Sequence, residues 1–167
     1  THAVQIARLV GASFIVAVDP LPSARERALK LGADVALDPS ATDVVSEIRA
    51  LTGGEGLDVT LDLVGKNAVL QQAVGSLASL GRAVMVGISI DPLELGPSIL
   101  LAIQRQTVMG HLGYSKKNLE DLVTLLARKR LDLTASISDV MPLEQVPDGV
   151  RRLAEKDGDP VRLVVKP

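Results

Sequence analysis

The chain has 167 residues, a net charge of -2 at pH 7 and no cysteine. This length predicts a domain with a sizeable core, and the near-neutral charge gives no sign of nucleic-acid or anionic-membrane binding. The lack of cysteine excludes disulfides and thiolate metal ligands within this chain, and no apolar run reaches the roughly 20 residues of a membrane helix. We therefore expect neither a nucleic-acid nor a membrane partner. A cytoplasmic location is a separate expectation, which the lack of cysteine does not decide.

Short β-branched runs alternate with amphipathic stretches along the whole chain. The first residues, from Ala3 to Val10, have helical spacing. The later strands are predicted at 14–18, 33–37, 57–64, 83–86, 107–109 and 161–165, and the later helices at 23–31, 42–51, 67–77, 119–130 and 143–154. Ser23 begins a capping-box pattern, and Thr42 or Asp43 can serve as an N-cap. This alternation predicts an α/β fold, namely a Rossmann-like, doubly wound parallel sheet in three αβα layers.

Three of the predicted strands are followed by residues that suit a ligand site. Asp19 follows the strand 14–18, and Gly65 and Gly87 follow two later strands. In parallel sheets of this kind, ligands bind at the carboxyl ends of the strands. A glycine after a strand can also simply form a tight turn, but all three residues together predict a ligand cleft.

Asp19 has the position of the acidic residue that holds a ribose in dinucleotide-binding folds. That residue ends the second strand, about 20 residues after a glycine-rich phosphate loop, and it favours NAD over NADP because it repels a 2′-phosphate. Counting back from Asp19 reaches the beginning of this sequence, which opens inside a helix. We therefore expect that Thr1 is not the natural start and that the first strand and its glycine loop lie upstream. In the strand order 3-2-1-4-5-6, their absence would divide the sheet.

Five blocks in order resemble one known family: 1–8, 17–34, 51–65, 80–87 and 142–167. The family is that of the medium-chain, zinc-type alcohol dehydrogenases. The resemblance implies that residues 1–139 are the NAD(P)-binding domain and that 140–167 return to a catalytic domain. It implies hydride transfer between an alcohol and NAD, with NADP less favoured, and zinc in the parent protein with ligands outside this chain. It also implies an alcohol or carbonyl substrate, a homodimer or homotetramer, and no catalytic or metal-binding residue in this segment, which alone should be inactive.

The resemblance also assigns cofactor-binding roles to individual residues. Asp19 would hold the adenosine ribose, Arg25 would cover the adenine side, and Arg162 would pair with the pyrophosphate. The remaining assigned residues are Thr1 and His2 near the phosphate turn, Leu63, Val64 and Gly65 at the nicotinamide ribose, Lys66 near the phosphates or that ribose, and Val86, Gly87, Ile88, His111, Leu112 and Gly113 at the nicotinamide.

Three other functions remain open at this point. A zinc-free quinone or enoyl reductase of the same family would use NADPH, against which Asp19 argues. A methyltransferase also holds a ribose with an acidic residue after its second strand, but it ends in an antiparallel hairpin. A non-catalytic nucleotide-binding module is the third alternative.

Overall fold

A computed structural model describes residues 1–167, and none of its helices is long and apolar enough to span a membrane. The chain divides into two compact units. The first, unit 1, combines residues 1–37 with 116–167, and the second, unit 2, is the continuous segment 38–115.

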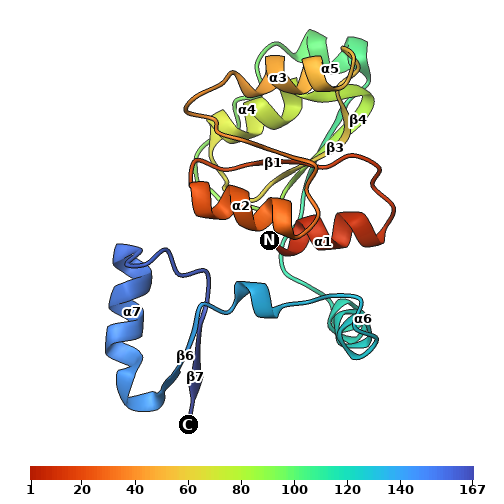
Figure 1. Cartoon of the computed structure of the whole chain (residues 1–167). Coiled ribbons are helices and arrows are strands. Elements are labelled where there is room, and N and C mark those ends of the chain that lie inside the picture. The colour runs from red at the N-terminus through yellow and green to blue at the C-terminus, as the bar shows by residue number, and fades with distance from the viewer. The chain divides into compact units, whose positions relative to one another are not determined.

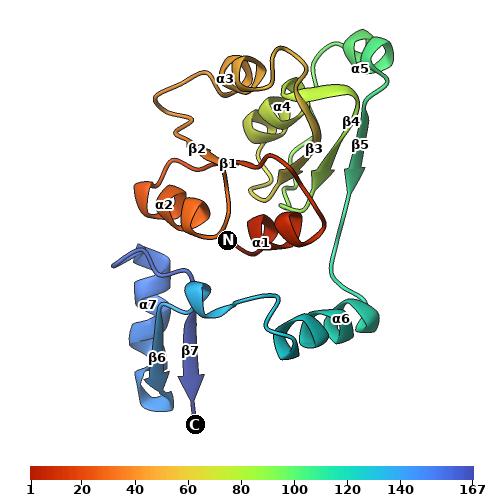
Figure 2. The ribbon, with the colours of Figure 1, turned by 45° about the vertical axis from the view of Figure 1, so that its right-hand side comes forward.

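Unit 2 contains a three-stranded parallel sheet with the order β3-β4-β5. In Figure 2 the three strands stand side by side, with β4 in the middle. Its elements are α3 (Val44–Leu51), β3 (Leu57–Asp62), α4 (Asn67–Gly75), β4 (Leu77–Met85), α5 (Ser98–Gln104) and β5 (Thr107–Gly110). The core consists of Leu70 and Val74 of α4, packed on Leu77 and Ala83 of β4. These apolar side chains fix α4 on the sheet. They therefore also fix the carboxyl end of β3, which precedes the helix, and the beginning of β4, which follows it.

One arginine joins several turns of unit 2. The Arg49 guanidinium, in the last turn of α3, donates to the carbonyl oxygens of Gly54 at 3.0 Å and Glu55 at 2.8 Å. It also donates to those of Gly75 at 3.1 Å and Leu77 at 2.7 Å. The planar fork of Arg suits such a cluster of acceptors. Arg49 thus ties the end of α3 to the end of α4 and the start of β4.

Strand β4 is longer than the predicted strand 83–86. It begins at Leu77, and its pairing with β3 changes register between Leu57 and Val59. Leu80 lies in this part of β4 with a left-handed φ of 65°. A bulge and a left-handed residue look like a turn in the sequence, which explains why the pattern concealed the first half of the strand.

Unit 1 contains two separate parallel strand pairs, β1-β2 and β6-β7. Figure 1 shows α7 beside β6 and β7. The helices are α1 (His2–Leu9), α2 (Pro22–Lys30), α6 (Lys116–Ala127) and α7 (Val146–Glu155), with 3-10 turns at Thr134–Ser136 and Leu143–Gln145. The strands are β1 (Val16–Val18), β2 (Val35–Leu37), β6 (Asp139–Pro142) and β7 (Leu163–Lys166).

Side chains of α1 join the two sequence segments of unit 1. The Gln5 amide donates to the Asp132 carbonyl at 2.7 Å and accepts from the Asp132 N–H at 3.0 Å, as a neighbouring strand would. One turn earlier, the His2 ring lies 3.0 Å from the hydroxyl of Ser136, a buried residue. These contacts connect residues that are well over a hundred positions apart, so the first helix and the later segment form one unit.

Of the two predicted helix N-termini with named caps, one is confirmed and one is wrong. Asp43 caps α3, as predicted, by accepting the Ser46 N–H at 2.7 Å. The capping box predicted at Ser23 is wrong, because α2 begins at Pro22 and the Ser23 hydroxyl instead bonds the Asp159 carboxylate. Proline fits the first helical position because it has no N–H to satisfy.

The predicted α/β class with parallel strands is confirmed, and the strands fall into separate sheets. The first strand is shorter than predicted, and Val18 is 40% exposed, because β1 has β2 as its only paired neighbour. Strand β6 was not predicted. It contains the proposed boundary between residues 139 and 140, and that division stays a prediction.

Candidate functional site

Asp62, the last residue of β3, holds two turns of unit 2 together. It is 2% exposed, and its Oδ1 accepts the N–H groups of Val64 at 2.8 Å and Gly65 at 3.0 Å. Its backbone carbonyl accepts the N–H groups of Val86 at 2.8 Å and Gly87 at 2.9 Å. One residue therefore fixes the backbone after β3 through its side chain and the backbone after β4 through its main chain.

The two turns touch at their glycines. Gly65 has a left-handed φ of 81°, and a Cβ placed on it would lie 2.7 Å from the Ile88 nitrogen. A Cβ on Gly87 would overlap the backbones of Gly65 and Val64. Because the obstacles are backbone atoms, they cannot rotate away, and both positions require glycine. The close approach of the two strand ends is therefore the structural reason for glycine at both positions, and a ligand role for them stays a prediction.

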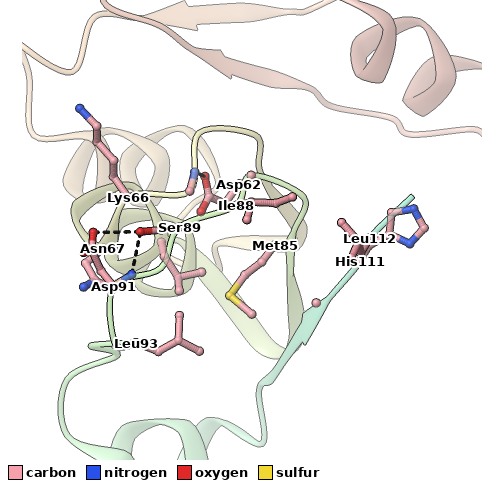
Figure 3. A pocket seen from close by; sticks show the side chains of 14 residues that line it. Asp62, Lys66, Asn67, Met85, Ile88, Ser89, Asp91, Leu93, His111 and Leu112 are labelled. Carbon is pink, nitrogen blue, oxygen red and sulfur yellow. Dashed lines mark hydrogen bonds between the residues drawn. The ribbon is translucent and has the colours of Figure 1, made fainter. Parts of the chain in front are cut away.

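A cavity of about 490 Å³ opens at the carboxyl ends of β3, β4 and β5, entirely within unit 2 (Figure 3). The strands contribute its wall through Asp62, Met85 and Gly110. Its other lining residues are Gly65, Lys66, Asn67 and Leu70 after β3, Gly87, Ile88, Ser89, Asp91 and Leu93 after β4, and His111 and Leu112 after β5. Such a location is where parallel sheets bind their ligands.

The cavity combines apolar walls with a few polar groups. Figure 3 shows Met85 between Leu93 on one side and Leu112 with His111 on the other. The Lys66 side chain is exposed and extends away from Met85. A site of this composition suits a flat organic ring with a polar substituent, since apolar side chains can cover its faces and polar groups orient its edge.

Unit 1 contains the second group of predicted residues, around Asp19. The Asp19 Oδ1 accepts the Leu21 N–H at 2.9 Å, which closes a turn after β1. Arg25 stabilises the same turn, because its Nη1 donates to the carbonyls of Asp19 and Pro20, each at 2.8 Å. The second carboxylate oxygen of Asp19 has no donor from the chain, so it can accept hydrogen bonds from a ligand.

His2 lies in a local network of unit 1. The Ser136 hydroxyl donates to the Leu133 carbonyl at 2.7 Å, so the His2 Nε2 at 3.0 Å must be the donor to Ser136. Burial, and after it the cation of Arg162, lower the pKa of His2 below its ordinary value. Thr1, the remaining predicted residue in this area, accepts through its hydroxyl from Arg27 Nε at 3.3 Å.

The cavity includes some of the predicted cofactor residues of unit 2 and leaves out others. Gly65, Lys66, Gly87, Ile88, His111 and Leu112 line it. Leu63 and Val64 do not, and their side chains are 55% and 56% exposed; Val86 and Gly113 also lie outside the lining. Asp62, Asn67 and the segment from Ser89 to Leu93 were not among the predicted site residues. For Asp62 the available signal was a carboxylate three residues before Gly65, inside the predicted strand 57–64.

No group of three or more His, Cys, Asp or Glu side chains in this chain is arranged to hold a metal ion. The residues present therefore do not fit a zinc site.

The parallel pairing of β6 with β7 differs from the antiparallel hairpin expected of a methyltransferase.

A family model described as zinc-binding dehydrogenase matches residues 1–128. The chain belongs to this family. The resemblance to zinc-type alcohol dehydrogenases is thereby confirmed.

Individual relatives agree with this assignment. The chain is 33% identical to putative alcohol dehydrogenase D of Mycobacterium tuberculosis over 98% of this chain and 46% of that protein. It is 38% identical to (R,R)-butanediol dehydrogenase of Bacillus subtilis over 66% of this chain and 32% of that protein. Among solved structures, an alcohol dehydrogenase from Thermus sp. ATN1 has a TM-score of 0.91 and 30% identity, covering 98% of this chain and 47% of that one. The chain thus spans less than half the length of these relatives.

Proposed function

We propose that this chain is the cofactor-binding part of an NAD-dependent dehydrogenase that transfers hydride between an alcohol and NAD. The observation that carries the proposal is the cavity at the carboxyl ends of β3, β4 and β5, with Gly65 and Gly87 in contact at its edge. The names of the relatives, alcohol dehydrogenase and butanediol dehydrogenase, support an alcohol or the matching carbonyl compound as the substrate class.

Within the cavity, we assign the nicotinamide and its ribose to the space beside Met85 and Leu112. The bound nicotinamide supplies the hydride chemistry. The chain's own residues bind and orient it: Met85, Ile88 and Leu112 exclude water from the ring faces, and the absence of Cβ atoms at Gly65 and Gly87 lets the two turns meet at the edge of the cavity. Lys66 is assigned to the ribose or phosphate oxygens.

In unit 1, Asp19 is proposed to receive the hydroxyls of the adenosine ribose. Its open carboxylate oxygen supports this role, and its negative charge disfavours a 2′-phosphate, so NAD is the proposed cofactor. The zinc of the family would have ligands outside this chain. The cytoplasmic location and a homodimeric or homotetrameric state stay predictions.

The experiment is a fluorescence titration of the protein with NADH and, separately, with NADPH. The chain has no tryptophan, so indole cannot transfer energy to the dihydronicotinamide. We expect NADH to bind at least about tenfold more tightly than NADPH, and Asp19→Asn to reduce this ratio. Asp58→Asn, at an exposed acidic residue of β3, is the matched control and should leave the ratio unchanged. Binding of neither nucleotide would contradict the proposal, and preference for NADPH would favour a quinone or enoyl reductase.

A further inference from the structure

One wall of the cavity is an irregular segment, residues 88–96, between β4 and α5. It contributes Ile88, Ser89, Asp91 and Leu93 to the lining. The segment has little regular structure of its own, and Ile90 at its centre is 100% exposed. Its internal hydrogen bonds join Ser89 and Asp91, as drawn in Figure 3. Something outside the segment must therefore define its position.

Two side chains of α4 provide that connection. The Asn67 Nδ2 donates to the Pro92 carbonyl at 2.9 Å, and its Oδ1 accepts the Glu94 N–H at 3.2 Å. The Gln71 Nε2 donates to the Glu94 carbonyl at 2.9 Å. Asn67 and Gln71 are four residues apart, so they lie on the same face of the helix. Their amides pair with the segment's backbone as an adjacent strand would.

Residues 88–96 are connected to the rest of unit 2 by these three hydrogen bonds from Asn67 and Gln71. The remaining anchor is apolar, since Leu95 packs against the core formed around Leu70 and Val74. Asn67 itself lines the cavity, while Gln71 does not. Leu95 thus fixes one end of the segment, and the two amides determine where the part that faces the cavity runs.

We propose that Asn67 and Gln71 are positioning residues that hold residues 92–94 on α4 and thereby set how tightly the cavity binds its ligand. The inference rests on the proposed function for the identity of that ligand, the nicotinamide end of NAD. The amides act through the backbone that they hold, because this backbone carries Ser89, Asp91 and Leu93 to the cavity.

The test combines hydrogen exchange with nucleotide binding. Hydrogen–deuterium exchange is followed by mass spectrometry on peptides covering 88–96 in the wild type, Asn67→Ala, Gln71→Ala and the double variant. NADH affinity is measured on the same samples by fluorescence. Gln72→Ala is the matched control, since it removes the same kind of side chain from the neighbouring position of α4, where the amide makes no hydrogen bond. Asn67→Asp keeps the acceptor for the Glu94 N–H and loses the donor to Pro92.

We expect the double variant to exchange about tenfold faster in this segment and to bind NADH several-fold more weakly. Asn67→Asp should be no closer to the wild type than Asn67→Ala in both measurements, because a carboxylate oxygen would face the Pro92 carbonyl oxygen in place of the donor. Gln72→Ala should match the wild type. Unchanged exchange in the double variant would overturn the inference. Faster exchange with unchanged NADH affinity would overturn the link to the ligand.

If the wild type binds neither NADH nor NADPH, the proposed function fails. The exchange measurement still decides whether Asn67 and Gln71 hold the segment, because it needs no ligand. The two failures are therefore distinguishable.

Discussion

Gly65 and Gly87 lie with their backbones in direct contact, one after β3 and the other after β4. The contact brings two neighbouring strand ends closer than any side chain would permit. It also forms an edge of the cavity, since both glycines line it.

A methyl group at this contact should be strongly destabilising. We expect Gly87→Ala to lower the free energy of unfolding by roughly 3 kcal/mol, because the added Cβ meets backbone atoms that cannot move aside. Gly110→Ala is the control: its Cβ would meet only the end of the Met85 side chain, at 3.9 Å, and should change the stability by less than about 0.5 kcal/mol. Urea unfolding measures both, and equal stability of the two variants would refute the contact.

Removing the Asp62 carboxylate should loosen the turn after β3. Asp62→Ala leaves the N–H groups of Val64 and Gly65 without their acceptor, and we expect a loss of roughly 2 to 3 kcal/mol in urea unfolding. Asp62→Asn keeps an acceptor oxygen and should lose less. Asp58→Ala, at an exposed position of the same strand, should be nearly neutral. An Asp62→Ala variant as stable as Asp58→Ala would contradict the role given to this carboxylate.

We expect that a lysine at position 49 cannot provide the stability that Arg49 gives. An ammonium group cannot reach all the carbonyls that the guanidinium bonds, so Arg49→Lys should cost roughly 2 kcal/mol of stability. Arg82→Lys, at an exposed arginine of β4, is the matched control and should change little. Thermal unfolding followed by circular dichroism compares the pair, and a shift in Arg82→Lys as large as in Arg49→Lys would argue against the cluster.

We expect the protein to become less stable in mild acid, because His2 takes up a proton on unfolding. Since burial and Arg162 lower its pKa in the folded state below the ordinary 6.5, the unfolded state binds more protons between the two values. The contribution of His2 is therefore complete above about pH 6.5 and is lost as the pH falls through the folded-state pKa. Urea unfolding between pH 5 and 8 should show this slope, and His2→Gln should reduce it. An identical slope in the variant would show that other groups cause it.

Much of the fold could be predicted because local patterns decide it. The cap at Asp43 needs only the bond to the Ser46 N–H three residues on, and the prediction was correct. At Ser23 the same reasoning failed, because the hydroxyl bonds the carboxylate of Asp159. Local sequence patterns do not indicate that these two distant residues lie close together. Strand β6 was missed for a similar reason: its pairing partner β7 lies more than twenty residues further on.

The candidate site divides in the same way. Gly65 and Gly87 could be found because each directly follows a predicted strand. Asn67 could not be found, since its amide contacts a segment 25 residues away whose course no periodicity describes. Asp62 lay within a predicted strand, where a carboxylate looks like an exposed residue until the turns it holds are known.

The pairing of Gln5 with Asp132 has a consequence for the order in which the chain can fold. Unit 2 is one continuous segment and is complete once residue 115 has left the ribosome. Unit 1 cannot make its contacts from α1 until Asp132 and Ser136 have also been synthesised. During translation, the segment 1–37 must therefore wait for the later segment 116–167 before unit 1 can form.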